Sequence, residues 1–155
     1  PPLMAQAPPA TPAIDSTWLQ ADPVARSVEM KLIAGFTNSF GGLNFNGVRE
    51  GGLTLTVPVG WKVVLSFTNR DPNLPHSVEV IRDARPVPTA PAAAAFPGAA
   101  GTRLAEGHSN GAGEKITFTA ARAGSYLVFC AVPGHGVAGM WLRLNVVEGG
   151  SPSLK

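Results

Sequence analysis

Apolar and polar residues alternate along much of the chain with the period of two that is typical of half-buried β-strands. Val28, Met30 and Leu32 alternate with Glu29 and Lys31, and the same pattern recurs downstream. The alternating or apolar stretches lie at residues 27–36, 42–47, 53–58, 61–69, 76–82, 115–120, 124–131 and 139–148. Turn residues separate these stretches. About seven or eight strands without a helical pattern in the body predict an all-β fold, an antiparallel Greek-key β-sandwich.

Three segments depart from this alternation. Residues 1–14 are rich in Pro and Ala, which predicts an extended linker or tether ahead of a single domain at 15–155. Residues Ile14–Asp22 predict a short helix with Asp15 or Ser16 as its N-cap. The Pro-, Ala- and Gly-rich stretch at about 83–107 predicts a long surface excursion, with a helical turn near Ala92–Phe96.

Composition and charge exclude several classes of protein. The chain has 155 residues, which suits one domain, and its 12 Lys and Arg residues are scattered, so it lacks the basic stripe of a nucleic-acid-binding protein. A single cysteine cannot form an internal disulfide. The sequence contains no apolar run long enough to span a membrane. It starts at Pro1, so an upstream signal or membrane anchor is a hypothesis.

The stretch FCAVPGHGVAGMW brings together three unusual residues at even spacing, Cys130, His135 and Met140. A lone cysteine is more often a small buried apolar residue than a ligand. Here, however, all three residues belong to one Pro- and Gly-rich loop between two predicted strands. A soft thiolate, an imidazole and a thioether suit copper better than magnesium or calcium. A trigonal copper site with two histidines and a weak axial methionine needs one more imidazole.

Two histidines could supply that imidazole. His76 begins a predicted strand, and its alternation with Val78 and Val80 points it inward at one end of the sandwich. His108 lies in a polar, Gly-rich loop without a flanking strand, which favours a solvated side chain. We therefore expect His76 to be the partner of the cysteine loop.

The chain resembles the blue-copper cupredoxins, and among them the sulfocyanins and rusticyanins. The resemblance rests on LPHSVEVI followed far downstream by YLVFCAVPGHGVAGMW, and it extends over roughly Met30–Val147 apart from the excursion. It implies one type 1 copper ion per chain, bound strongly by His76, Cys130 and His135 and weakly by Met140. Ser77 follows the first histidine, as a serine does in the rusticyanin-like group. Many other cupredoxins have Asn at this position.

The same resemblance implies surroundings and partners for the site. Further residues expected around the ligands are Ser77, Asn44, Asn46, Phe129 and Pro133. The ring N–H of His76 would donate a hydrogen bond to the side chain of Asn44 or Asn46, or to a backbone carbonyl. Electrons would pass through His135, inside an apolar patch made of Gly134, Gly136, Val137 and Ala138. The expected protein is a monomeric, extracytoplasmic, high-potential electron carrier of a respiratory chain, with redox partners of the cytochrome or terminal oxidase type.

Other functions are possible from the residues alone. A copper carrier or storage module would use the same ligand types but would keep them exposed for exchange. A copper enzyme such as a multicopper oxidase needs His-x-His motifs, which the chain lacks, so we do not expect an enzyme. A metal-free sandwich is the third alternative.

The remaining large and charged side chains are expected to be structural. The core is expected to contain Trp61, Phe67, Phe118, Phe129 and Trp141, and a solvated face Glu79 and Arg82.

Overall fold

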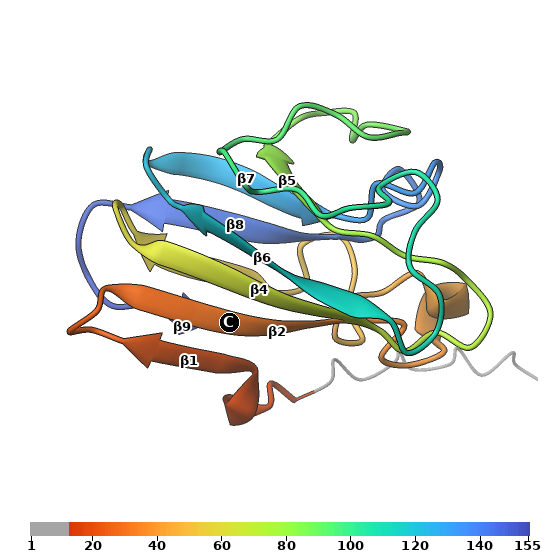
Figure 1. Ribbon diagram of the computed structural model, residues 1–155, viewed down its shortest axis with the longest axis horizontal. Coiled ribbons are helices and arrows are strands. Elements are labelled where there is room, and N and C mark those ends of the chain that lie inside the picture. Colours follow the sequence, from red (N-terminus) through yellow and green to blue (C-terminus); the bar gives the residue numbers. More distant parts are fainter. Residues whose placement is uncertain (1–12) are drawn as a thin grey trace, which may run out of the picture.

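The protein is a sandwich of two β-sheets (Figure 1). A computed structural model describes residues 13–155, so the linker expected at 1–14 lies almost entirely outside the described residues. Nine strands occur in this part of the chain, together with 3-10 helices at Ser16–Trp18 and Ser39–Gly42. The strands are β1 (Leu19–Asp22), β2 (Ser27–Ala34), β3 (Thr54–Pro58), β4 (Lys62–Asn69), β5 (Glu79–Arg82), β6 (Gly113–Thr119), β7 (Gly124–Phe129), β8 (Trp141–Val147) and β9 (Ser153–Leu154).

The expected β-sandwich is confirmed, but its sheets are mixed rather than wholly antiparallel. One sheet has the order β1-β2-β4-β6 and the other the order β5-β7-β8-β3-β9. The pairs β2–β4 and β3–β8 are parallel. The reason lies in the chain path, because β3 follows β2 in sequence but belongs to the opposite sheet, so β4 returns beside β2 in the same direction.

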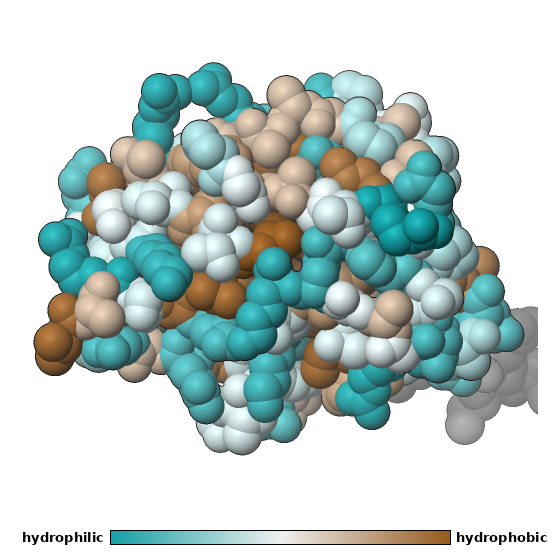
Figure 2. Space-filling model, in the orientation of Figure 1, coloured by the Kyte–Doolittle hydropathy of each residue, from teal (hydrophilic) through white to brown (hydrophobic). Residues whose placement is uncertain are grey.

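The inward positions of the alternating pattern form the core. Val63, Leu65 and Phe67 on β4 are at most 2% exposed. All five aromatic residues expected in the core are buried. Figure 2 shows hydrophilic residues scattered between hydrophobic ones over one face of the molecule. Within residues 13–155, no helix has the length and hydrophobicity needed to cross a membrane.

The excursion is an ordered cover for β5 rather than a free loop. Two residues of the excursion form backbone hydrogen bonds with Val80 of β5. Ala95 N–H donates to Val80 O, and Val80 N–H donates to Ala99 O, each over 2.8 Å. These bonds protect the open edge of β5. Val87 packs on the outer face of the same sheet, in a second apolar cluster with Ile81, Leu127, Phe129, Ala131 and Trp141. The helical turn expected at Ala92–Phe96 is not formed.

One further expectation is confirmed in part, and another is wrong. Asp15 does cap a helix, accepting from Thr17 N–H over 2.8 Å, but that helix ends at Trp18 because Leu19–Asp22 pairs with β2 instead. Glu79 was expected on a solvated face, yet it is 1% exposed because the excursion covers it, and its carboxylate accepts from Ala92 N–H over 2.9 Å. Arg82, in contrast, is exposed as expected.

Candidate metal centre

The cysteine loop, residues 130–140, connects the end of β7 to the start of β8. Backbone bonds give the loop a closed shape, because Cys130 N–H donates to Met140 O and Met140 N–H donates to His135 O, each over 3.1 Å. The Gly residues in FCAVPGHGVAGMW allow this tight path, and Gly134 and Gly139 adopt positive φ angles of 86° and 111°. The loop therefore holds its three chemically distinctive residues at one end of the sandwich.

Two histidines and the cysteine converge at this end. The possible ligand atoms of His76, Cys130 and His135 all lie within 4.8 Å of one another. The Cys130 Sγ is 3.8 Å from His76 Nδ1 and 3.5 Å from His135 Nδ1. His76, Cys130 and Met140 are fully buried, whereas His135 is half-buried. Three donors of the expected types thus surround one small volume, and Met140 is joined to it through the backbone.

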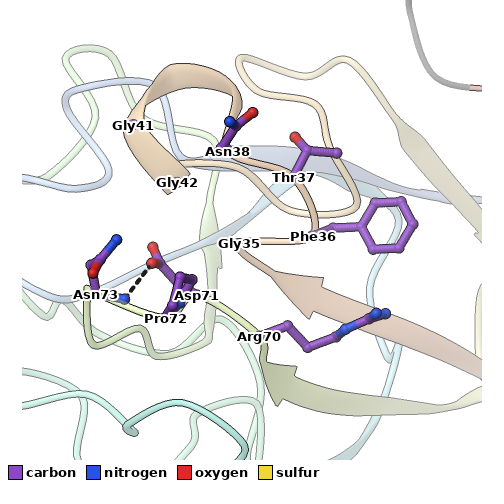
Figure 3. A pocket seen from close by; sticks show the side chains of 10 residues that line it. All are labelled: Gly35, Phe36, Thr37, Asn38, Gly41, Gly42, Arg70, Asp71, Pro72 and Asn73. Carbon is purple, nitrogen blue, oxygen red and sulfur yellow. Dashed lines mark hydrogen bonds between the residues drawn. The ribbon is translucent and has the colours of Figure 1, made fainter.

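Asp71 fixes the ring of His76, which corrects the expectation that Asn44, Asn46 or a backbone carbonyl would do so. The Asp71 Oδ2 lies 2.8 Å from His76 Nε2. A carboxylate acceptor there keeps the proton on Nε2 and leaves the lone pair of Nδ1 facing the cysteine. Asp71 is itself held by Asn73 N–H over 2.9 Å and Leu74 N–H over 3.2 Å. Asp71 and Asn73 are among the residues that line a pocket of about 390 Å³, which Figure 3 shows from close by.

The side chains of the two asparagines bond backbone groups on or just after β2 instead. The Asn44 amide donates to the backbone carbonyls of Thr37 and Ser39. The Asn46 side chain accepts from Ile33 N–H and donates to Lys31 O. Both amides are therefore committed to backbone groups, which belong to the segment after β2 for Asn44 and to β2 itself for Asn46.

Ser77 contacts the cysteine strand in two ways. Its backbone N–H donates to Cys130 Sγ over 3.3 Å, and its hydroxyl accepts from Ala131 N–H over 3.1 Å. The hydroxyl proton is given to Leu104 O over 2.8 Å. Ser77 therefore ties the segment carrying His76 to the segment carrying Cys130.

The electrostatics of the site favour neutral donors. Burial raises the pKa of the Cys130 thiol to about 11, although hydrogen bonds from Ser77 and Val132 act in the opposite direction. Burial lowers the pKa of His135 to about 4, and the neighbouring His76 lowers it further. Burial also lowers the pKa of His76, against the raising effect of Asp71. Neutral imidazoles are ready to coordinate a cation, while the thiol needs a bound cation to become a thiolate. This donor set fits a soft metal ion.

Comparison with known proteins decides the family. The family model described as "Sulfocyanin (SoxE) domain" matches residues 15–151 of this chain. The chain belongs to the sulfocyanin family. A curated sulfocyanin from Sulfolobus acidocaldarius is 27% identical over 126 residues, which make up 77% of this chain and 63% of that protein. The chain thus spans less than two thirds of the length of this relative.

Solved structures of blue-copper proteins share the fold. Auracyanin B aligns with a TM-score of 0.55 at 21% identity, covering 82% of this chain and 93% of that one. A reduced rusticyanin aligns with a TM-score of 0.54 at 24% identity, covering 79% and 77%. An auracyanin from Roseiflexus castenholzii gives 0.52 at 19% identity, covering 77% and 96%. The fold is therefore that of the cupredoxins, and membership of the sulfocyanin family together with the cluster fits one type 1 copper ion per chain.

The other histidine of this sulfocyanin-family domain is placed beside the cluster but outside it. His108 was expected to be solvated, yet its side chain is only 11% exposed and its Nε2 lies 2.6 Å from Glu114 Oε2. Its backbone forms a bridge with His76, with His108 N–H donating to His76 O over 2.8 Å. His108 therefore bonds the backbone of His76, while its side chain contacts Glu114 and not the cysteine.

The residues expected to form an apolar patch around His135 are exposed except at one position. Pro133, Gly134, Val137 and Ala138 are exposed, and Val137 reaches 52%. Gly136 is buried, because it packs so closely on the Phe129 ring that a Cβ there would lie 2.6 Å from it. Phe129 accordingly forms the floor of the loop.

Sequence reasoning missed Asp71 and Glu114. Asp71 lies in RDPNLPH, among the turn residues between the predicted strands at 61–69 and 76–82, and it precedes the histidine by five residues. That spacing was the available signal for Asp71. Glu114 lies six residues after His108 and twelve after Thr102, in a Gly-rich stretch whose path the alternating pattern does not define.

Proposed function

We propose that this protein is a type 1 blue-copper electron carrier, in which His76, Cys130 and His135 are the strong ligands and Met140 is the axial ligand. The observation that carries the proposal is the convergence of two imidazole nitrogens and one buried sulfur within 4.8 Å. Membership of the sulfocyanin family supports it. Residues 15–155 would act as one cupredoxin domain.

Bound copper would supply a one-electron Cu(II)/Cu(I) couple; the chain supplies a rigid cage. Asp71 holds His76, the Ser77 amide and the Met140 carbonyl hold Cys130, and the Gly-rich loop holds His135. Because these contacts fix the donors before an electron arrives, few atoms need to move on transfer. A small reorganisation favours fast outer-sphere exchange.

The surroundings of Cys130 favour a high reduction potential. The sulfur accepts the Ser77 N–H, which lowers its electron density and disfavours the oxidised state. Phe129, Val132 and Trp141 are at most 8% exposed and form an apolar shell. Such a shell disfavours the complex with the higher net charge, which is the oxidised one.

Electrons would enter and leave through His135, the half-exposed histidine of the four expected ligands. The exposed Val137 and Ala138 beside it suit the small, brief contacts of redox partners. We propose partners of the cytochrome or terminal oxidase type, a monomeric carrier in a respiratory chain, and an extracytoplasmic location with a tether upstream. None of these roles requires an enzymatic activity of its own.

The visible and EPR spectra of the copper-loaded protein test the proposal. We expect an intense thiolate-to-copper band that disappears in Cys130→Ala, together with reversible redox cycling. Met140→Leu should alter the EPR signal, whereas Met30→Leu, which changes a buried core methionine, should not. A band that persists in Cys130→Ala would contradict the assignment. Rapid Cu(I) loss to a chelator without reversible cycling would instead indicate a copper carrier, a role that the burial of His76, Cys130 and Met140 disfavours.

A further inference from the structure

The end of the excursion, together with the residues that follow it, is bonded directly to the segment that carries His76. We call residues 99–109 the strap. Gly101 N–H donates to Val78 O over 2.9 Å, Leu104 O accepts from the Ser77 hydroxyl over 2.8 Å, and His108 pairs with His76 through two backbone bonds of 2.8 and 3.1 Å. The strap therefore contacts three consecutive residues, His76, Ser77 and Val78, beside the metal centre.

The strap also bridges the open side of the sandwich. β5 and β6 are edge strands of different sheets. Figure 1 shows the chain passing, in green to teal, from beside β5 to the start of β6. One side of the strap is bonded to His76 and Ser77. An interaction that fixes the other side of the strap to β6 would therefore also keep the strap against these two residues.

One carboxylate on β6 makes that connection. Glu114 accepts Thr102 N–H with its two oxygens, over 3.0 and 2.9 Å, and the Thr102 hydroxyl over 3.2 Å. Its Oε2 also lies 2.6 Å from His108 Nε2. Glu114 thus binds the strap at two points, six residues apart, and pairs in register with Phe67 in the sheet. Charge-assisted hydrogen bonds of this kind are stronger than neutral ones.

The strap has no slack between these points. A Cβ on Gly101 would lie 2.6 Å from Glu114 Oε2, and a Cβ on Gly107 would lie 2.9 Å from the His76 backbone nitrogen. Gly107 also has a φ of 76°, which other residues rarely adopt. Movement of the strap at Glu114 is therefore transmitted to the backbone of His76.

We infer that Glu114 is a positioning residue for the metal centre, which fixes His76 and Ser77 by holding the strap against them. The inference rests on the proposed copper site. It assigns to the excursion a part of the metal cage, although Glu114 itself lies outside the expected ligand set. Loss of a residue that orients a metal ligand typically costs about 10- to 100-fold in metal affinity.

The test compares copper release from Glu114→Ala, Glu114→Gln and His108→Ala. The reduced, copper-loaded proteins are mixed with a Cu(I) chelator, and the EPR spectrum of each oxidised protein is recorded. We expect Glu114→Ala to release copper about 10-fold faster than the unmodified protein or more, with an altered EPR signal. Glu114→Gln keeps an oxygen for Thr102 N–H and should restore most of the retention, with His108→Ala between the two.

Two control variants separate positioning from general stability. Glu29→Ala removes an exposed carboxylate that pairs with Lys115, the neighbour of Glu114, over 3.2 Å, and should leave release unchanged. Val57→Ala weakens the buried core on β3, away from the cysteine loop. The inference is overturned if copper release from Glu114→Ala is no faster than from Glu29→Ala. It is also overturned if Val57→Ala releases copper as fast as Glu114→Ala when the two variants have lost the same thermal stability. If Glu114→Ala does not fold, Glu114→Gln and His108→Ala decide by the same comparison with Glu29→Ala.

Hydrogen exchange in the copper-free protein keeps this inference distinct from the proposed function. The amides of Gly101, Thr102 and His76 should exchange faster in Glu114→Ala than in Glu29→Ala. Unchanged exchange at these amides overturns the inference even if copper binds as proposed. A missing thiolate–copper band in the unmodified protein would defeat the proposed function, whatever the exchange data show.

Discussion

Replacement of Asp71 by Asn should weaken copper binding through the orientation of a single proton. In the native structure the Asp71 carboxylate accepts from His76 Nε2, from Asn73 N–H and from Leu74 N–H, over 2.8, 2.9 and 3.2 Å. An Asn side chain has one oxygen and one NH₂ group. If the oxygen stays with the turn, the NH₂ faces Nε2 and favours the histidine tautomer whose proton sits on Nδ1, where a metal would bind. If the amide turns over, the bonds to the turn are lost.

The expected size of this effect follows from the contact that changes. Orienting partners of metal ligands are typically worth about 10- to 100-fold in affinity. This range corresponds to about 1.4–2.8 kcal/mol. Competition with a chelator of known affinity measures it directly. The same chemical change on the surface is Asp83→Asn, which affects exposed pairs with Arg85 and Arg143 and should leave affinity unchanged.

A second substitution reaches the same carboxylate by a steric route. A Cβ added to Gly42 would collide with Asp71 Oδ2, so Gly42→Ala should displace the carboxylate without removing it. Affinity in Gly42→Ala should fall in the same direction as in Asp71→Asn. Binding by Asp71→Asn within about threefold of the unmodified protein, well short of the tenfold expected, would refute the role assigned to Asp71.

Three other predictions concern the remaining buried groups. Burial raises the pKa of the Glu79 carboxyl above 4.5. The stability that the protonated carboxyl contributes to the folded protein is therefore fully present below pH 4.5 and is lost as the pH rises through the folded-state pKa. Glu79→Gln should unfold at a higher urea concentration than the unmodified protein at about pH 8, but not at about pH 4. With a pKa of about 11, Cys130 in the copper-free protein should react slowly with iodoacetamide at neutral pH, and fast labelling of the folded protein would contradict its burial. Met140→Leu removes an axial donor to the oxidised site and should raise the reduction potential measured by redox titration; a lower potential would argue against an axial Met140.

The inward side of strands such as β4 was predictable because their burial follows a local period of two. His76 shares its side of the chain with Val78 and Val80, and all three are fully buried. This alternation placed His76 correctly before the position of any neighbouring strand was known. The spacing of Cys130, His135 and Met140 likewise describes a single loop, so its closure depended on nearby residues only.

What the sequence could not show depends on segments that meet from afar. Glu79 alternates away from the core as expected, but periodicity does not reveal that the excursion covers the outer face. Glu114 likewise meets Thr102 and His108 only because the strap returns to β6. The parallel pairing of β2 and β4 depends on the placement of β3 in the other sheet. Asp71 was the nearest of these omissions, because the Pro-rich turn hid a carboxylate that faces the histidine.

The unequal burial of the four expected ligands sets a route for metal loading. His76, Cys130 and Met140 are enclosed by the sandwich, and only His135 lies at its surface. With copper bound as proposed, an incoming ion would approach past His135, and a departing ion would leave by the same side. A redox partner docked on Val137 and Ala138 would cover this passage. The protein is thus expected to lose copper least readily while a redox partner is bound, so that docking for electron transfer would also help to retain the metal.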